Sequence, residues 1–444
     1  TIGSGSAGKT FTISFWLKIS STSANHTIVG LSSDSNSTKY VEVALKSNHK
    51  LDIQFRNGTS GDNGTYLRRR TNRLFRDVNA WYHIVVRVDS TQGSASDRFR
   101  LYINGVQETS IDVDSTADMP QNYVTDFNNN GSTFRIGRGA GSSSYYLDGL
   151  LSHFHFADGQ SLAPTVFGET DSTTGEWKII ASPTFTVGTE GFTILKDGMT
   201  ITDQSSNSND FTLGGGTLTN TEDCPSNVFA TFNPLHNTSA TMSNGNLTAQ
   251  STNSNYISGV STLGTKTGKF YAEFKLIAEG ASGESVIGVT ALVRPTSAIV
   301  GQTGNFGIRN NSGLNYYTSG GTAYTGTSQH DNFTVNDIIG VALDMDNGRV
   351  YFSKNGGWWN GASTWTGTSP STYVTLQTDI YDEFFFECGD AAGSQNANWS
   401  ANFGNGYFGT TQISSEGTNA SGIGKFEYDV PTGYTALSTK GLNE

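Results

Sequence analysis

Charged residues are scarce in this sequence, since Asp, Glu, Lys and Arg together make up only 15% of its 444 residues. No run of 18 apolar residues occurs, so the sequence predicts no membrane-spanning helix and no membrane insertion. Cysteine occurs twice, at Cys224 and Cys388. Two cysteines so far apart favour reduced thiols over a fold held by disulfides, as in a protein made in a cytoplasm.

The sequence also lacks an excess of basic residues and a recognisable signal peptide. Its formal net charge of -12 argues against nucleic-acid binding, which normally needs a basic surface, and leaves room for divalent cations. No N-terminal stretch has the form of a secretory leader. Residue 1 is Thr rather than Met, so we expect the chain to start downstream of a natural initiator.

Glycine and aromatic residues are abundant instead, with 53 glycines and 11% aromatics. Nine Asn-Gly pairs occur, among them Asn104-Gly105, Asn347-Gly348 and Asn355-Gly356. Asn-Gly is the preferred pair of two-residue hairpin turns, and aromatic side chains fill pleated surfaces. No segment keeps a helical period over eleven residues. The sequence therefore predicts an all-β protein with antiparallel sheets and few, short helices.

Alternating apolar residues divide the chain into two β-sandwiches. The first, over residues 1–157, begins with a strand in which the odd positions from Phe11 to Ile19 alternate with Thr12, Ser14, Trp16 and Lys18, a pattern that predicts a half-buried strand. A β-rich connector follows over 158–224. The second sandwich, over 225–410, contains a hairpin around Asn347-Gly348, and residues 411–444 form an irregular C-terminal tail that could dock onto a neighbour.

Two groups of motifs carry a family resemblance. The segment 81–89, with 96–98 and 101–106, resembles the laminin-G-like and pentraxin-like branch of concanavalin-type sandwiches. The segments 268–274, 337–344 and 350–356 resemble a SPRY-type sandwich. The continuation 154–162, followed by 167–171, is similar to structural virion proteins of marine and cyanobacterial tailed bacteriophages, and the order of the motifs across both sandwiches fits the same family.

The resemblance implies a protein on the exterior of a phage particle, made in the bacterial cytoplasm. Its expected function is that of a tail-fibre or surface-appendage adhesin whose sandwich loops bind a host-surface glycan. Other virion proteins and further copies of the chain, in a trimer, are the expected partners. The alternatives are a capsid decoration or tail scaffold protein without a glycan ligand, and a polysaccharide-degrading virion enzyme.

We expect that this protein is not an enzyme and that it has no catalytic residues. Glycoside hydrolases of this fold place acidic residues at alternate positions of one strand. The nearest match is Glu383-Phe384-Phe385-Phe386-Glu387, where Phe385 stands at the position that would need Asp. The only two acidic residues of this stretch are therefore Glu383 and Glu387, which lie about 13 Å apart along a strand. This distance is too long for either the retaining or the inverting mechanism.

Calcium is the one cofactor that the sequence suggests, and none is required. Laminin-G-like domains bind calcium at one rim, and Asp112, Asp114 and Asp118 crowd a single loop. The alternative is a solvated acidic loop.

Five arginines lie within nine positions, at Arg68, Arg69, Arg70, Arg73 and Arg76. Guanidinium groups suit carboxylates and phosphates, so the cluster could contact another subunit or an anionic ligand. Its alternative is a charged strand edge that prevents unwanted pairing.

A glycine-rich segment supplies a candidate glycan site formed by Trp358, Trp359, Trp365, Asn355 and Asn360. Indole rings on such loops can stack on sugar rings. Alternatively, the tryptophans close one end of the sandwich.

Overall fold

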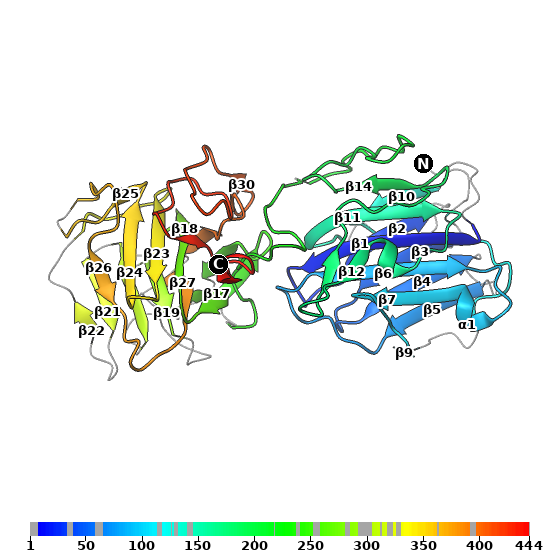
Figure 1. Cartoon of the computed structure of the whole chain (residues 1–444), viewed down its shortest axis with the longest axis horizontal. Helices are drawn as coiled ribbons and strands as arrows, with labels where there is room; N and C mark the ends of the chain where they lie inside the picture. The colour runs from blue at the N-terminus through cyan, green and yellow to red at the C-terminus, as the bar shows by residue number, and fades with distance from the viewer. Residues whose placement is uncertain are drawn as a thin grey trace. The chain divides into compact units, whose positions relative to one another are not determined.

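The computed structural model describes residues 8–32, 39–57, 65–112, 118–125, 127, 132–139, 145–216, 218–236, 240–251, 258–279, 285–291, 304–310, 313–317, 323–325, 330–361, 364–390 and 397–443. The chain forms two compact units, Thr1–Asn220 and Thr221–Glu444 (Figure 1). Strands dominate both units, and α1 (Ala95–Arg98) is the only α-helix in the described part of the chain. The predicted all-β, antiparallel fold class is confirmed.

The first unit is a sandwich of two sheets, each with six strands among the described residues. The first sheet has the order β14 (Phe192–Ile194), β11 (Gly149–Asp158), β1 (Thr10–Ile19), β6 (Tyr82–Asp89), β7 (Phe99–Ile103), β8 (Val106–Gln107). The second has the order β10 (Thr133–Ile136), β2 (His26–Ser32), β3 (Lys39–Leu45), β4 (Leu51–Asn57), β5 (Thr65–Thr71), β9 (Ile111–Asp112).

The core of this unit lies between the two sheets. On β1, Phe11, Ile13, Phe15, Leu17 and Ile19 all point into it, as their alternation predicts. The second sheet contributes the facing layer of β-branched, leucine and phenylalanine side chains. One shared core therefore holds both sheets as a stiff frame.

The opposite face of β1 is buried as well, which the sequence pattern did not predict. Thr12, Ser14, Trp16 and Lys18 are each at most 4% exposed. The covering layer comes from the residues that follow β11. It includes η2 (Pro164–Val166) and the hairpin of β12 (Gly168–Thr170) and β13 (Trp177–Ile179). The predicted half-buried strand is therefore buried on both faces.

The predicted connector belongs to the first unit. Its strand β14 pairs with β11, and Phe192 and Ile194 pack into the core between the sheets. The unit boundary at residues 220 and 221 thus differs from the predicted division, because residues 158–220 bury apolar side chains on the first sandwich.

The second unit is also a sandwich. One sheet has the order β15 (Ala240–Ser243), β16 (Thr248–Ser251), β28 (Asn398–Asn402), β18 (Lys269–Ala278), β23 (Ile338–Asp344), β24 (Arg349–Lys354), β25 (Gly357–Trp358), with β26 (Tyr373–Thr375) on β24 and β31 (Thr435–Ala436) on β18. The other has the order β17 (Ser258–Thr265), β27 (Phe384–Asp390), β19 (Ser285–Thr290), β20 (Asn305–Arg309), β21 (Gly313–Tyr317), β22 (Ala323–Thr325).

The C-terminal residues pack on this second sandwich. β31 runs parallel to β18, after the small hairpin of β29 (Tyr407–Phe408) and β30 (Thr411–Gln412), and η4 (Gly441–Asn443) ends the described chain. Phe426, Val430 and Tyr434 form a second apolar cluster with Tyr271 and Ala342 on the outer side of the sheet. The predicted tail is thus irregular over most of its length, and it packs on its own unit.

Two Asn-Gly pairs form the predicted tight turns. Asn104 and Gly105 have φ of 48° and 77°, and Asn355 and Gly356 have φ of 50° and 83°, as a two-residue turn requires. Asn347-Gly348 instead lies in a four-residue loop between Asp344 and Arg349.

Candidate ligand-binding face

One surface of the first unit gathers polar side chains from most of the strands of one sheet. In β3, β4 and β5 every second residue points into the core, which leaves the alternate positions on the outer surface. Cross-strand pairs fix which of these lie beside one another, since Glu42 faces Gln54 and Asp52 faces Arg70. We call this surface the arginine face; its members are Tyr40, Glu42, Lys46, Asp52, Gln54, Arg56, Arg68, Arg70, Asp112 and Arg135.

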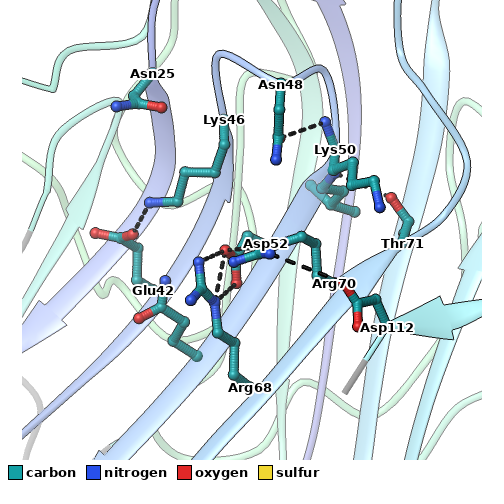
Figure 2. A network of polar contacts seen from close by, with 12 residues as sticks. Asn25, Glu42, Lys46, Asn48, Lys50, Asp52, Arg68, Arg70, Thr71 and Asp112 are labelled. Carbon is teal, nitrogen blue, oxygen red and sulfur yellow. Dashed lines mark hydrogen bonds and ion pairs between the residues drawn. The ribbon is translucent and has the colours of Figure 1, made fainter. Parts of the chain in front are cut away.

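Asp52 is the centre of this face, and its side chain is completely buried under two arginines (Figure 2). Arg68 donates from Nε to Oδ1 and Oδ2 at 3.0 and 2.8 Å, and from Nη2 to Oδ2 at 2.5 Å. Arg70 donates from Nε to Oδ2 at 3.4 Å. A carboxylate held by two guanidinium groups fixes both arginine side chains in place, which is the arrangement a preorganised anion site needs.

The neighbouring positions add further ordered polar groups. Lys46 Nζ lies 2.5 Å from Glu42 Oε1, and the Tyr40 hydroxyl donates to Gln54 Oε1 at 2.9 Å. Burial and the Glu42 carboxylate raise the pKa of Tyr40, while Arg56 beside it acts in the opposite direction. The face therefore carries a phenol, an amide and several charges in one fixed register.

The arginine face is cationic although the whole chain is acidic. It holds five cationic side chains and three acidic ones, a formal charge of +2, whereas the chain carries -12. Such a local excess of positive charge attracts anions more strongly than the net charge of the chain implies.

The five clustered arginines do not form one site. Arg68 and Arg70 lie on the arginine face, but Arg69 alternates to the opposite side of β5, where burial lowers its pKa and Asp118 accepts from its Nη2 at 3.4 Å. Arg73 pairs with Glu108 at 2.8 Å, and Arg76 is exposed on the loop that follows. Because side chains alternate between the two faces of a strand, arginines that are neighbours in the sequence lie on opposite faces of β5.

The predicted calcium ligands are also separated. Asp112 faces Arg70, with 3.9 Å between its Oδ2 and Nη1, whereas Asp118 is held by Arg69 from the other side of β5. Asp114 lies outside the described residues. Within the described part of the chain, no three His, Cys, Asp or Glu side chains gather as a metal site would need.

The prediction that three tryptophan rings are available to stack on a sugar is wrong for Trp358 and Trp359. Trp358 is 5% exposed and Trp359 is 3% exposed. Because β25 pairs with β24, alternation sends Trp358 toward the cluster under Phe426 and Trp359 into the sandwich core. These indoles therefore pack the second unit, and neither can stack on a ligand.

The remaining members of that set differ in their environment. Asn355 makes the turn between β24 and β25, and its amide donates to Asp337 Oδ1 at 2.6 Å. Trp365 is partly exposed and donates to the Asp331 carbonyl at 2.9 Å. Asn360 is exposed. Asn355 is exposed as well, so Trp365, Asn355 and Asn360 could still contact a glycan.

A buried Ser–His pair in the first unit has the wrong proton arrangement for a nucleophile. Ser14 Oγ lies 2.8 Å from His83 Nε2, and Trp177 Nε1 donates to His83 Nδ1 at 3.0 Å. An indole nitrogen only donates, so the His83 proton is on Nε2 and Ser14 accepts it. Burial lowers the pKa of His83 to about 3. This histidine therefore cannot take a proton from Ser14, and it packs between Trp16 and Trp177.

The two glutamates of the tested hydrolase pattern have different surroundings. Glu383 precedes β27 and is partly exposed, whereas Glu387 is fully buried within β27. Asn305 Nδ2 donates to Glu387 Oε1 at 2.7 Å, and burial raises the pKa of this glutamate to about 7. Glu387 is thus a satisfied buried carboxyl rather than part of a carboxylate pair.

Sequence reasoning missed most of the arginine face. Tyr40, Glu42, Asp52, Gln54 and Arg56 are its missed members on β3 and β4. The signal was present, because these residues occupy the polar positions of two alternating strands. What the pattern could not give was the pairing of β4 with β5, which joins Asp52 to Arg68 and Arg70.

Comparisons with known proteins agree with the two sandwiches. Residues 2–166 match the concanavalin A-like lectin/glucanases superfamily, and residues 269–371 match the SPRY domain. No curated protein matches the chain. The solved SPRY domain of human HERC1 is 19% identical and covers 38% of this chain and 96% of its own, with a TM-score of 0.32.

A heptameric SAP-like pentraxin from Limulus polyphemus is 16% identical and covers 36% of this chain and 69% of its own, with a TM-score of 0.24. The two family matches fall in different units, one before and one after the boundary at residues 220 and 221. The chain therefore carries a concanavalin A-like domain followed by a SPRY domain.

Proposed function

We propose that this chain is a non-enzymatic binding protein on the exterior of a tailed-bacteriophage particle, and that its first domain contacts a glycan of the host surface. The observation that carries the proposal is the arginine face, a fixed array of phenol, amide and charged groups on a stiff sandwich. Sugars offer many hydroxyl groups, and such an array can pair with them without refolding.

The assignment to a virion is motivated by the order of the laminin-G-like and SPRY-type motifs along the chain. A repeated, homo-oligomeric appendage would display several arginine faces at once, and multivalency would strengthen weak glycan contacts. The described residues also support a role without catalysis. His83 is held as a hydrogen-bond donor to Ser14, and Glu387 is closed off by Asn305.

Binding of the purified chain to a panel of bacterial surface polysaccharides tests this proposal. We expect binding that Tyr40→Phe weakens about 3- to 10-fold, because it removes a hydroxyl group from the face. Gln54→Ala should weaken it as well, because the buried Gln54 amide holds the Tyr40 hydroxyl in place at 2.9 Å. Asn360→Ala, which changes the candidate contact on the second domain, should leave it unchanged.

A loss with Asn360→Ala and none with Gln54→Ala would move the site to the SPRY domain. If the chain binds no polysaccharide of the panel, a capsid decoration or tail scaffold role would replace the proposal. Release of reducing sugar ends from any polymer would indicate an enzyme instead.

A further inference from the structure

One arginine on the second unit lies among tyrosines rather than against an acid. We propose that Arg349, stacked on Tyr373, forms a carboxylate-binding subsite for an acidic side chain of a protein partner. This inference concerns the second unit alone, so it does not depend on the function proposed for the arginine face.

The first step is the way in which Arg349 is held. It begins β24, and β26 pairs with this end of β24 (Figure 1). Val350 and Val374 point into the core, so Arg349 and Tyr373 share the outer face. The guanidinium carbon lies 4.2 Å from the centroid of the Tyr373 ring, and a hydrogen bond to Tyr351 raises the pKa of Arg349. These contacts fix the guanidinium group before a ligand arrives.

Two further tyrosine rings surround this pair. The Tyr351 ring packs against Tyr373 with 5.7 Å between centroids and an angle of 64°. Tyr434 arrives from the C-terminal residues, and burial and the nearby Asp344 carboxylate raise its pKa. Tyr351 and Tyr434 are buried, whereas Tyr373 is 40% exposed. Of the three rings, that of Tyr373 is therefore the one open to a partner.

The second step concerns the acid that faces Arg349. Asp344 is its cross-strand partner on β23, but other donors occupy this carboxylate. Lys269 Nζ lies 3.2 Å from its Oδ2, and Asn347 donates to its two oxygens at 3.0 and 2.9 Å. Among the described residues, Arg349 forms no ion pair with an acid. It thus keeps N–H donors that no carboxylate in this part of the chain uses.

The third step is the kind of partner. A guanidinium group binds a carboxylate through two parallel N–H···O bonds, and this geometry is specific whatever the surrounding net charge. Arg and Tyr are enriched among the residues that dominate protein interfaces. One fixed guanidinium beside one exposed phenol ring matches a single Asp or Glu side chain. An acidic polysaccharide repeats its charges along the polymer and would need several cations in a row.

The test measures binding of the full chain to immobilised poly-L-glutamate, and to polygalacturonate as a polysaccharide with the same acidic group. Arg349→Lys keeps the positive charge but loses the planar group, and Arg349→Gln loses both. Lys440→Gln is the matched control, because it removes one positive charge from an exposed position of the same unit. Thermal unfolding of each variant checks that the fold is kept.

We expect the affinity for poly-L-glutamate to fall at least about 5-fold in Arg349→Gln and nearly as far in Arg349→Lys, because an ammonium group cannot form two parallel hydrogen bonds. Tyr373→Ala removes the stacked ring and should weaken binding about 3-fold. Lys440→Gln should stay within about 2-fold. The Arg349 variants should change binding to polygalacturonate less than about 2-fold, since its carboxylate is attached to the sugar ring without a flexible arm.

Three results would overturn the inference. No binding of the unaltered chain to poly-L-glutamate, or unchanged binding in Arg349→Gln, would remove the subsite. Full affinity in Arg349→Lys would leave only a general attraction between charges. A loss on polygalacturonate as large as that on poly-L-glutamate would replace the protein partner with an acidic polysaccharide. The Tyr40 and Gln54 variants test the proposed function separately, because they lie in the other unit.

Discussion

Two buried glutamates in the second unit have different structural roles because different groups donate hydrogen bonds to them. Burial raises the pKa of both Glu273 and Glu387 to about 7. Glu273 accepts from the backbone N–H groups of Glu427 and Tyr428, each at 2.8 Å. It thereby ties the C-terminal residues to β18. Glu387 instead accepts from the side chain of Asn305.

At the residue scale we predict that Glu387→Gln stabilises the protein above pH 7. In the folded state this carboxyl keeps its proton up to about pH 7, whereas in the unfolded chain it loses the proton near 4.5. The unfolding free energy therefore falls as pH rises from about 4.5 to 7. Gln can still accept from Asn305, so the variant should gain up to about 3 kcal/mol at pH 8 and none at pH 4. Urea unfolding at both pH values measures this.

Glu273→Gln is the contrasting variant for that experiment. It removes the same charge, but an amide would place a donor against the N–H of Glu427 or Tyr428. We expect a loss of about 1–3 kcal/mol at pH 8. A gain like that of Glu387→Gln would show that the carboxylate does not hold the C-terminal residues.

At the element scale, the segment after β11 acts as a third layer of the first sandwich. Trp177 on β13 stacks on His83 and passes over Gly105. A Cβ at Gly105 would lie 2.5 Å from the Trp177 ring. Glycine is therefore needed at this position both for the positive φ of the turn and for the close approach of Trp177. Residues that look like a linker thereby complete the fold.

We predict that Trp177→Ala lowers the unfolding free energy of the first unit by about 2–4 kcal/mol, since it removes a large ring and leaves His83 Nδ1 without its donor. Lys178→Ala is the control, because its ion pair with Asp171 is at the surface, where solvent screens it, and its loss should change stability little. Thermal unfolding of the two variants compares them. Equal effects would contradict a packing role for β12 and β13.

At the scale of the whole molecule, each unit has its own core. The first core contains Phe11 to Phe211, and the second contains Ala230 to Leu437. No helix in the described part of the chain is both long and apolar enough to span a membrane. Stability is therefore expected to divide between two β-sandwiches.

We predict that the effects of Trp177→Ala and Glu387→Gln are independent. Combined in one chain, they should shift separate calorimetric transitions and add to within about 0.5 kcal/mol, since the two residues share no core. A coupling of 1 kcal/mol or more in this double-mutant cycle would show that the units unfold together.

The sequence alone determined the strands and their inner faces. Phe270, Ala272 and Phe274 on β18, like Phe11 and Ile13 on β1, lie in the cores because a period of two is a local property of the chain. The Asn104-Gly105 turn follows from the same local chemistry. The two-domain order could be predicted in the same way.

Only the tertiary structure decided what lies on the other face of each strand. Trp358 is buried because the C-terminal residues around Phe426 pack over it. Trp16 is buried under His83, and Trp177 in turn packs on His83. Asp52 meets Arg68 because β4 pairs with β5 in one register. These contacts join segments distant in sequence or depend on register, and alternation within one strand carries no information about either.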